Sequence, residues 1–87
     1  MNDKPTVGRI VHYFTDDNSK QSNGMGNGPY PAIITQVFAE GTTGVMCNLK
    51  VFPPFKAPYD EGSVHTRSHA VEMGYTSRFW DWPARAA

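Results

Sequence analysis

The sequence predicts a small all-β domain, a five-stranded SH3-like barrel that forms an oligomer. Eight glycines and seven prolines accompany a single leucine, a composition that suits short strands and tight turns. Apolar and aromatic residues gather in five segments of strand length, and no stretch has the period of a useful amphipathic helix. The 87 residues allow one domain, 1–87, whose modest core favours sharing apolar surface between copies.

The first strand is expected at residues 9–14, after a flexible tail at 1–7 and a turn at Gly8. This segment is β-branched and aromatic, but its alternation does not say which face points into the barrel. Residues 15–29 are polar, Gly-rich and without period, so we expect a long loop. Such loops are often functional or mobile.

The second and third strands, residues 30–38 and 45–52, are expected to form a hairpin around a glycine-containing turn. The third strand alternates most cleanly between apolar and polar residues, which fixes its register against the core. Its predicted inward residues are Val45, Cys47, Leu49 and Val51.

Two more strands complete the barrel, at residues 63–71 and 78–82. A proline pair and a second long loop precede the fourth strand. At most one helical turn is expected, near residues 73–77, and the tail at 84–87 is expected to fray. Alternation puts Trp80 and Trp82 on one side of the fifth strand. Closing the barrel would pair this strand with the first and bring both tryptophans near Tyr13 or His12.

The charge balance narrows the function classes. Eight basic and eight acidic residues argue against a dedicated DNA-binding domain and against a polybasic membrane-surface protein. The single cysteine rules out an internal disulfide, and no apolar run is long enough to span a membrane. The N-terminus lacks an apolar signal core. We therefore expect a cytoplasmic protein that makes no membrane contact.

Catalysis and metal binding find little support in the sequence. His65 and His69 would lie about 13 Å apart on the predicted fourth strand, at ~3.3 Å per residue, which is too far for one metal ion. Cys47 lies on an apolar strand face and is expected to be a core residue rather than a nucleophile. We predict no catalytic residues, no metal site and no cofactor.

Aromatic residues give the stronger functional signal, because five strands cannot bury all eleven of them. Rings beside isolated cations are typical of sites that stack bases and hold phosphates. The predicted base-stacking residues are Tyr13, Trp80 and Trp82, and the predicted phosphate or ribose contacts are Arg9, His12 and Arg78. Replacing Trp80 or Tyr13 by alanine is expected to weaken binding without unfolding the chain. A homo-oligomer interface, dimeric or tetrameric, explains the surplus rings equally well.

Four motifs resemble, in this order, a widespread set of small phage and prophage proteins, over roughly residues 7–83. They are Gly-Arg-Ile-Val-His-Tyr at 8–13, Pro-Ala-Ile-Ile-Thr at 31–35, Asn-Leu-Lys-Val-Phe-Pro-Pro at 48–54 and Trp-Asp-Trp-Pro at 80–83. The order and spacing are fairly specific, whereas each motif alone is not. The loop at 15–29 lies outside the pattern.

In size and style the chain is similar to phage nucleotide sponges, such as the anti-CBASS cyclic-nucleotide sponge family. That resemblance implies a protein in the host bacterial cytoplasm that sequesters a cyclic dinucleotide or cyclic ADP-ribose-type immune signal without cleaving it. A virion decoration or adaptor protein is the alternative. A nucleic-acid-binding barrel comes third, because the net charge is zero.

Overall fold

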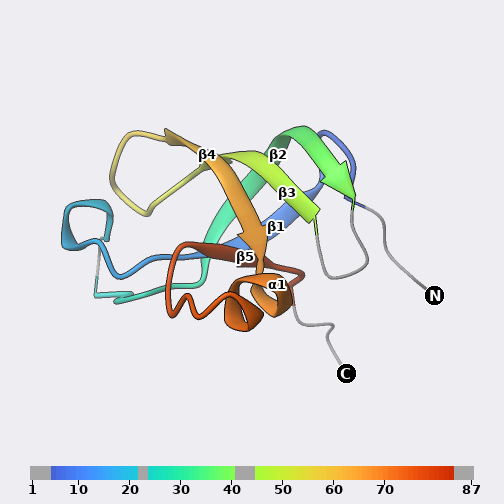
Figure 1. Ribbon diagram of the computed structural model, residues 1–87. Coiled ribbons are helices and arrows are strands. Elements are labelled where there is room, and N and C mark those ends of the chain that lie inside the picture. Colours follow the sequence, from blue (N-terminus) through green and yellow to red (C-terminus); the bar gives the residue numbers. More distant parts are fainter. Residues whose placement is uncertain (1–4, 22–23, 41–44, 84–87) are drawn as a thin grey trace, which may run out of the picture.

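The computed structural model describes residues 5–21, 24–40 and 45–83, and it shows an all-β protein with a closed five-stranded barrel (Figure 1). The elements are, in chain order, β1 (Ile10–Phe14), the 3-10 helix η1 (Asn18–Lys20), β2 (Tyr30–Glu40), β3 (Val45–Val51), β4 (Tyr59–Thr66), α1 (Arg67–Glu72) and β5 (Phe79–Asp81). The all-β, five-stranded barrel predicted from the sequence is confirmed. In the described part of the chain, no helix is long and apolar enough to cross a membrane.

Neighbouring strands are antiparallel except for β4 and β5, which run parallel. The predicted hairpin of β2 and β3 is confirmed, and β2 extends two residues beyond its expected end. The barrel closes through β1 and β5, where Tyr13 lies opposite Trp80 and His12 lies opposite Asp81. The expected proximity of the Trp-x-Trp segment to the first strand is therefore confirmed.

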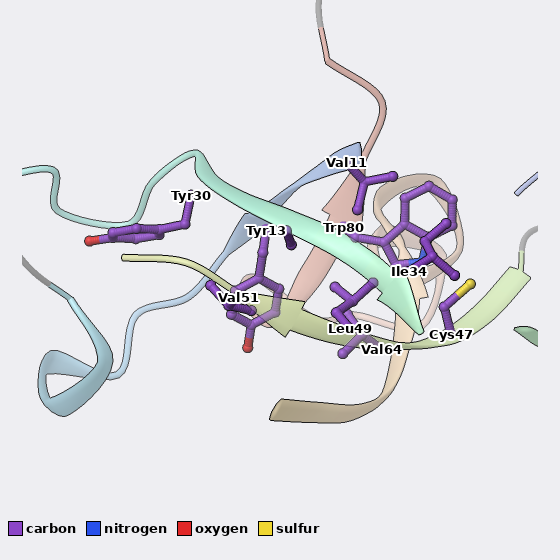
Figure 2. Close-up of a cluster of buried hydrophobic side chains, with 10 residues drawn as sticks. Val11, Tyr13, Tyr30, Ile34, Cys47, Leu49, Val51, Val64 and Trp80 are labelled. Atoms are coloured by element: carbon purple, nitrogen blue, oxygen red, sulfur yellow. The ribbon is translucent and has the colours of Figure 1, made fainter. Parts of the chain in front are cut away.

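The core fills the barrel with alternate residues of its strands. On β3, Cys47, Leu49 and Val51 are fully buried as predicted, and Val45 at the strand's start is half-buried. On β1 the buried side chains are those of Val11 and Tyr13, which settles the face that the sequence left open. Figure 2 shows core side chains from all five strands, with Ile34, Leu49, Val64 and Trp80 close together and Tyr30 farther along the barrel.

The predicted fourth strand at 63–71 is wrong in its bounds. β4 begins at Tyr59, within the expected second loop, and the chain turns into α1 at Arg67. The helix follows from the parallel pairing of β4 with β5. A connection between parallel strands needs about a dozen residues and usually contains a helix. The helix also lies earlier than the helical turn expected at 73–77. It packs against β4 and β5 (Figure 1) and buries Ala70.

The fifth strand is shorter than predicted, three residues instead of five. Phe79 and Trp80 are both buried although they are neighbours in sequence. Trp80 points into the barrel, whereas Phe79 is covered from outside by the ring of Phe14 at 5.3 Å and by the guanidinium of Arg67. Phe79, which strand alternation assigns to the outer face, is therefore buried by side chains that pack over that face.

The long polar loop after β1 is tied to the barrel at its described residues. Nζ of Lys20 contacts the buried carboxylate of Glu61 at 2.8 Å, and the ammonium of Lys56 donates to the carbonyls of Ser19 and Gln21. The amide of Thr15 donates to the carbonyl of Asn27 at 3.0 Å, which joins the two ends of the loop.

The expected turn at Gly8 is present, with a positive φ of 93°. Most of the tail predicted at 1–7, the whole tail at 84–87 and the centre of the turn between β2 and β3 lie outside the described residues. Pro5, which belongs to the predicted N-terminal tail, is buried.

Candidate functional site

The six residues predicted to bind a ligand divide between the core and two places on the surface. Tyr13 and Trp80 are fully buried, so neither ring offers a face on which a base could stack in this structure. Trp82 is half-buried, and its ring lies edge-on to Trp80 at 5.2 Å between centroids. The guanidinium of Arg9 lies 4.8 Å from the centroid of the Trp82 ring, a cation–π contact.

Arg78 lies at the opposite end of the β1–β5 pair. Its amide donates to the carbonyl of Phe14, while Arg9 precedes the first residue of β1. Phe14 is five positions after Arg9, which corresponds to about 17 Å at ~3.3 Å per strand residue. His12, half-buried between them, lies opposite Asp81. The structure therefore groups Arg9 with Trp82 and places Arg78 elsewhere.

Arg78 lines a surface pocket of about 410 Å³, which we name the His65 pocket. Its lining includes Asp16, Ser63, His65, Tyr75, Ser77 and Arg78. The pocket lies between the end of β1, the middle of β4 and the connection from α1 to β5. Its volume falls within the range usual for small-molecule sites, and polar groups form much of its wall.

Two residues of this pocket have left-handed backbone conformations that side chains rarely adopt: Ser63 has a φ of 55° and Arg78 a φ of 60°. Such strain persists only where the surroundings hold it, and it is concentrated at functional sites. The amide of Ser63 is held by Oδ1 of Asn48 at 2.9 Å. Beside Arg78, the hydroxyl of Ser77 accepts from the amide of Asp16 at 2.7 Å. Residues with a left-handed backbone conformation therefore contribute to the pocket from β4 and from the segment before β5.

Aromatic rings gather along one side of the His65 pocket. His65 stacks on Tyr75 with 6.4 Å between ring centroids and 25° between ring planes. His69 of α1 lies 4.9 Å from the ring of His65, far closer than the strand prediction of about 13 Å, because residues 67–72 are helical. Tyr75 is about half-exposed, and its amide donates to the carbonyl of Ala70. The arrangement presents an accessible, anchored ring beside a cation.

The positive charge available in the pocket depends on how strongly the guanidinium of Arg78 interacts with Glu61 and Tyr13. Its guanidinium lies 3.8 Å from Oε1 of Glu61, while Oε2 of that carboxylate accepts from Tyr13 at 2.5 Å and from Lys20 at 2.8 Å. Two other donors therefore already serve Glu61. The side-chain hydrogen bond with Tyr13 is the main factor that raises the pKa of Arg78. Arg78 stays half-exposed and positively charged at the pocket, opposed there by the carboxylate of Asp16.

Sequence reasoning identified Arg78 but missed His65, Tyr75 and Ser63 as members of one site. The sequence predicts a strand at residues 63–71 and at most one helical turn near 73–77, and no local pattern shows that these segments meet. A non-glycine residue in a left-handed conformation leaves no sequence signal either.

The described residues contain no cluster of three or more His, Cys, Asp or Glu side chains arranged to hold a metal ion. Fold and site together describe a small closed barrel with a polar surface pocket that carries one arginine and one accessible ring. Comparison with protein-family models, with curated proteins and with solved structures finds no match to this chain.

Proposed function

We propose that this protein is a non-enzymatic binder of a small anionic nucleotide, held in the His65 pocket. The observation that carries the proposal is the position of Arg78 beside the half-exposed ring of Tyr75 in a pocket of about 410 Å³. A guanidinium suits a phosphate through charge-assisted hydrogen bonds, and an accessible ring suits a base. The hydroxyls of Ser63 and Ser77 line the same pocket and suit ribose or phosphate oxygens.

The biological setting follows from the sequence resemblance. We propose a phage-encoded protein in the host bacterial cytoplasm that sequesters a cyclic dinucleotide or cyclic ADP-ribose-type signal of anti-phage defence. Sequestration needs tight binding and no chemistry on the ligand. We further propose a homo-oligomer, since several apolar side chains outside the core are exposed. They include Ile10, Phe38, Phe55 and Val71.

Calorimetry with a panel of cyclic dinucleotides and cyclic ADP-ribose tests the proposal. Arg78→Gln should weaken binding of the responding nucleotide at least tenfold, because a charge-assisted contact contributes about 1.5–3 kcal/mol. Lys50→Gln is the matched control: Lys50 is also half-exposed and lies 3.6 Å from a carboxylate, but it does not line the pocket. If both variants weaken nucleotide binding equally, the effect comes from the net charge of the protein, and the assignment of the site to the His65 pocket is wrong.

The stacking ring has its own matched pair of variants. Tyr75→Ala should weaken binding about ten- to a hundredfold, because a stacked base contributes ~1–3 kcal/mol. Phe55→Ala removes a more exposed ring outside the pocket and should leave the affinity unchanged. Chromatography of the ligand recovered from heated protein should return it intact. A hydrolysed nucleotide would identify an enzyme instead.

A second candidate, a virion decoration or adaptor protein, is favoured by one observation. Phe55 is 95% exposed and stands in a left-handed conformation next to Lys56, which is anchored to the loop after β1. A rigidly displayed ring is typical of a protein-binding anchor. Absence of nucleotide binding, together with co-purification of the chain with assembled phage particles, would decide for this candidate.

A further inference from the structure

The loop after β1 is connected to the His65 pocket through the buried carboxylate of Glu61. Glu61 is 5% exposed and lies on β4, two residues before Ser63 of the pocket wall. Its Oε2 accepts from the hydroxyl of Tyr13 and, at 2.8 Å, from Nζ of Lys20. Its Oε1 faces the guanidinium of Arg78 at 3.8 Å. One buried carboxylate is therefore shared between a lysine of the loop and the arginine of the pocket.

The two cations interact with Glu61 in different ways. The ammonium of Lys20 is within hydrogen-bond distance, whereas the 3.8 Å separation of Arg78 is too long for a hydrogen bond. The hydrogen bond with Tyr13 raises the pKa of Arg78 most, and the nearby Glu61 and Tyr75 raise it further. The guanidinium thus lies within electrostatic reach of both the carboxylate and the ring of the pocket. It has five N–H donors, which are not committed to Glu61.

The backbone on both sides of Lys20 is held in place. Lys20 is the last residue of η1, and the ammonium of Lys56 donates to the carbonyls of Ser19 and Gln21. The side chain of Lys20 is 33% exposed, less than the 56% of Arg78, so it is the more enclosed of the two partners of Glu61. The loop therefore presents its lysine to the carboxylate in a fixed position.

Removing the charge of Lys20 would change how Arg78 is used. A buried carboxylate that loses a charged partner is strongly destabilised, and Tyr13 is a neutral donor that supplies no charge. Arg78 has to move by only about 1 Å, from 3.8 Å to the roughly 2.7–2.9 Å of a charge-assisted hydrogen bond, to replace Lys20. An arginine paired in this way with Glu61 has less charge and fewer donors to offer to a phosphate.

We propose that Lys20 is a positioning residue of the His65 pocket, which neutralises Glu61 and so leaves the guanidinium of Arg78 free for an anion. Neither Lys20 nor Glu61 lines the pocket, so both act through Arg78. The inference rests on the proposed function, because it concerns the arginine that is proposed to hold the phosphate. It assigns a role to the polar loop at 15–29, which the sequence pattern left without one.

Nuclear magnetic resonance of labelled protein without ligand tests how Glu61 is shared. The side-chain Nε–Hε signal of Arg78 is assigned by its absence from Arg78→Gln. Lys20→Met should shift this signal and slow its exchange with solvent, because the guanidinium becomes hydrogen-bonded to Glu61. In a Glu61→Gln background there is no carboxylate to pair with, so Lys20→Met should leave the signal in place.

Titration with adenosine 5′-monophosphate measures the consequence for the pocket. Lys20→Met should raise the Kd about five- to tenfold, because the charge-assisted contact of Arg78 with Glu61 must first be broken. Lys20→Arg keeps the charge and should retain the affinity. In the Glu61→Gln background, Lys20→Met should change the Kd by less than about twofold. A lysine that only kept the loop ordered would not show this dependence on Glu61.

Lys56→Met is the matched control, because it releases the carbonyls of the loop but leaves the Lys20–Glu61 pair intact. It should change the Kd by less than about twofold. Weakening equal to that of Lys20→Met would assign the effect to loop order and overturn the proposal. An Arg78 signal that Lys20→Met does not shift would overturn it too. The two proposals fail separately: a wild type that binds no nucleotide contradicts the proposed function, and the Arg78 signal still decides the role of Lys20.

Discussion

The hydroxyl of Tyr13 donates a 2.5 Å hydrogen bond to Oε2 of Glu61, and Nζ of Lys20 contacts the same oxygen at 2.8 Å. Glu61 is almost fully buried, so its charge depends on these donors and on Arg78 at 3.8 Å. Burial, followed by the hydrogen bond and the charge of Glu61, raises the pKa of Tyr13 well above its ordinary value. Tyr13 is therefore a neutral donor inside the barrel and ties β1 to β4.

Replacing Tyr13 with phenylalanine should lower the free energy of unfolding by about 1.5–3 kcal/mol, because it removes a hydrogen bond to a buried charged group. Urea unfolding followed by fluorescence measures the loss. Tyr75→Phe, which alters a half-exposed tyrosine, should change stability by less than about 0.5 kcal/mol. Equal stability of the wild type and Tyr13→Phe would show that Glu61 does not rely on this donor.

The buried thiol of Cys47 should react slowly with DTNB in the native protein and quickly in urea. Burial raises its pKa to about 11, so the reactive thiolate is scarce as well as covered. Rapid labelling of folded protein would contradict the register of β3.

The same shift predicts a pH dependence of stability. The folded-state pKa of Cys47 lies above its ordinary value of 9.0, so the unfolded chain loses this proton first. The stability it contributes is complete below about pH 9 and is lost as pH rises towards about 11. The urea midpoint should fall over this window by less in Cys47→Ala than in the wild type. Tyr13 and Tyr59, whose pKa values burial also raises, add a loss above pH 10 in both proteins. Parallel curves for the two proteins would contradict the role of Cys47.

The two tryptophans should respond differently to truncation. Trp80→Ala should lower the free energy of unfolding by about 3–5 kcal/mol, because it leaves a large cavity in the core. The sequence-based expectation is that this variant stays folded and only binds less; the burial of Trp80 predicts a loss of stability instead. Trp82→Ala, at a half-buried position, should stay folded and lose the contact with Arg9. Thermal unfolding by circular dichroism compares them, and a stable Trp80→Ala would remove Trp80 from the core.

Replacing Phe55 with glycine should stabilise the folded protein. A left-handed φ costs a side chain about 1–2 kcal/mol, and the extra freedom of unfolded glycine offsets roughly 0.5–1 kcal/mol of that. Phe55→Gly should therefore raise the free energy of unfolding by about 0.5–1 kcal/mol. Phe52→Gly, a control nearby without positive φ, should lower it. A loss of stability in both variants would show that the Phe55 ring supports the fold.

Light scattering coupled to gel filtration should find a dimer or tetramer. Exposed apolar side chains on a small barrel favour shared burial between copies, and closed symmetry is the usual outcome. Ile10→Lys, at a 60% exposed position on β1, tests whether that surface takes part. A wild-type monomer of about 10 kDa at tens of micromolar would contradict the oligomer.

The sequence alone determined the barrel, the hairpin of β2 and β3 and the pairing of β5 with β1. These features rest on the alternation of apolar residues, as in Cys47, Leu49 and Val51, and alternation is a local property that burial of one face imposes. The sequence also named Arg9, Arg78 and Trp82 as candidate ligand contacts, but it did not pair Arg9 with Trp82, whose cation–π contact only the structure shows.

Only the tertiary structure decided how residues 59–78 fold and what they bring together. Their apolar pattern is weak, and the helix between β4 and β5 follows from the parallel pairing of these two strands. Left-handed backbone conformations at Ser63, within β4, and at Arg78, before β5, occur at the His65 pocket. The burial of Tyr13 and Trp80 could not be predicted from the sequence either. An aromatic side chain looks the same in sequence whether it stacks on a ligand or fills a core, and only the closed barrel assigns these two to its interior.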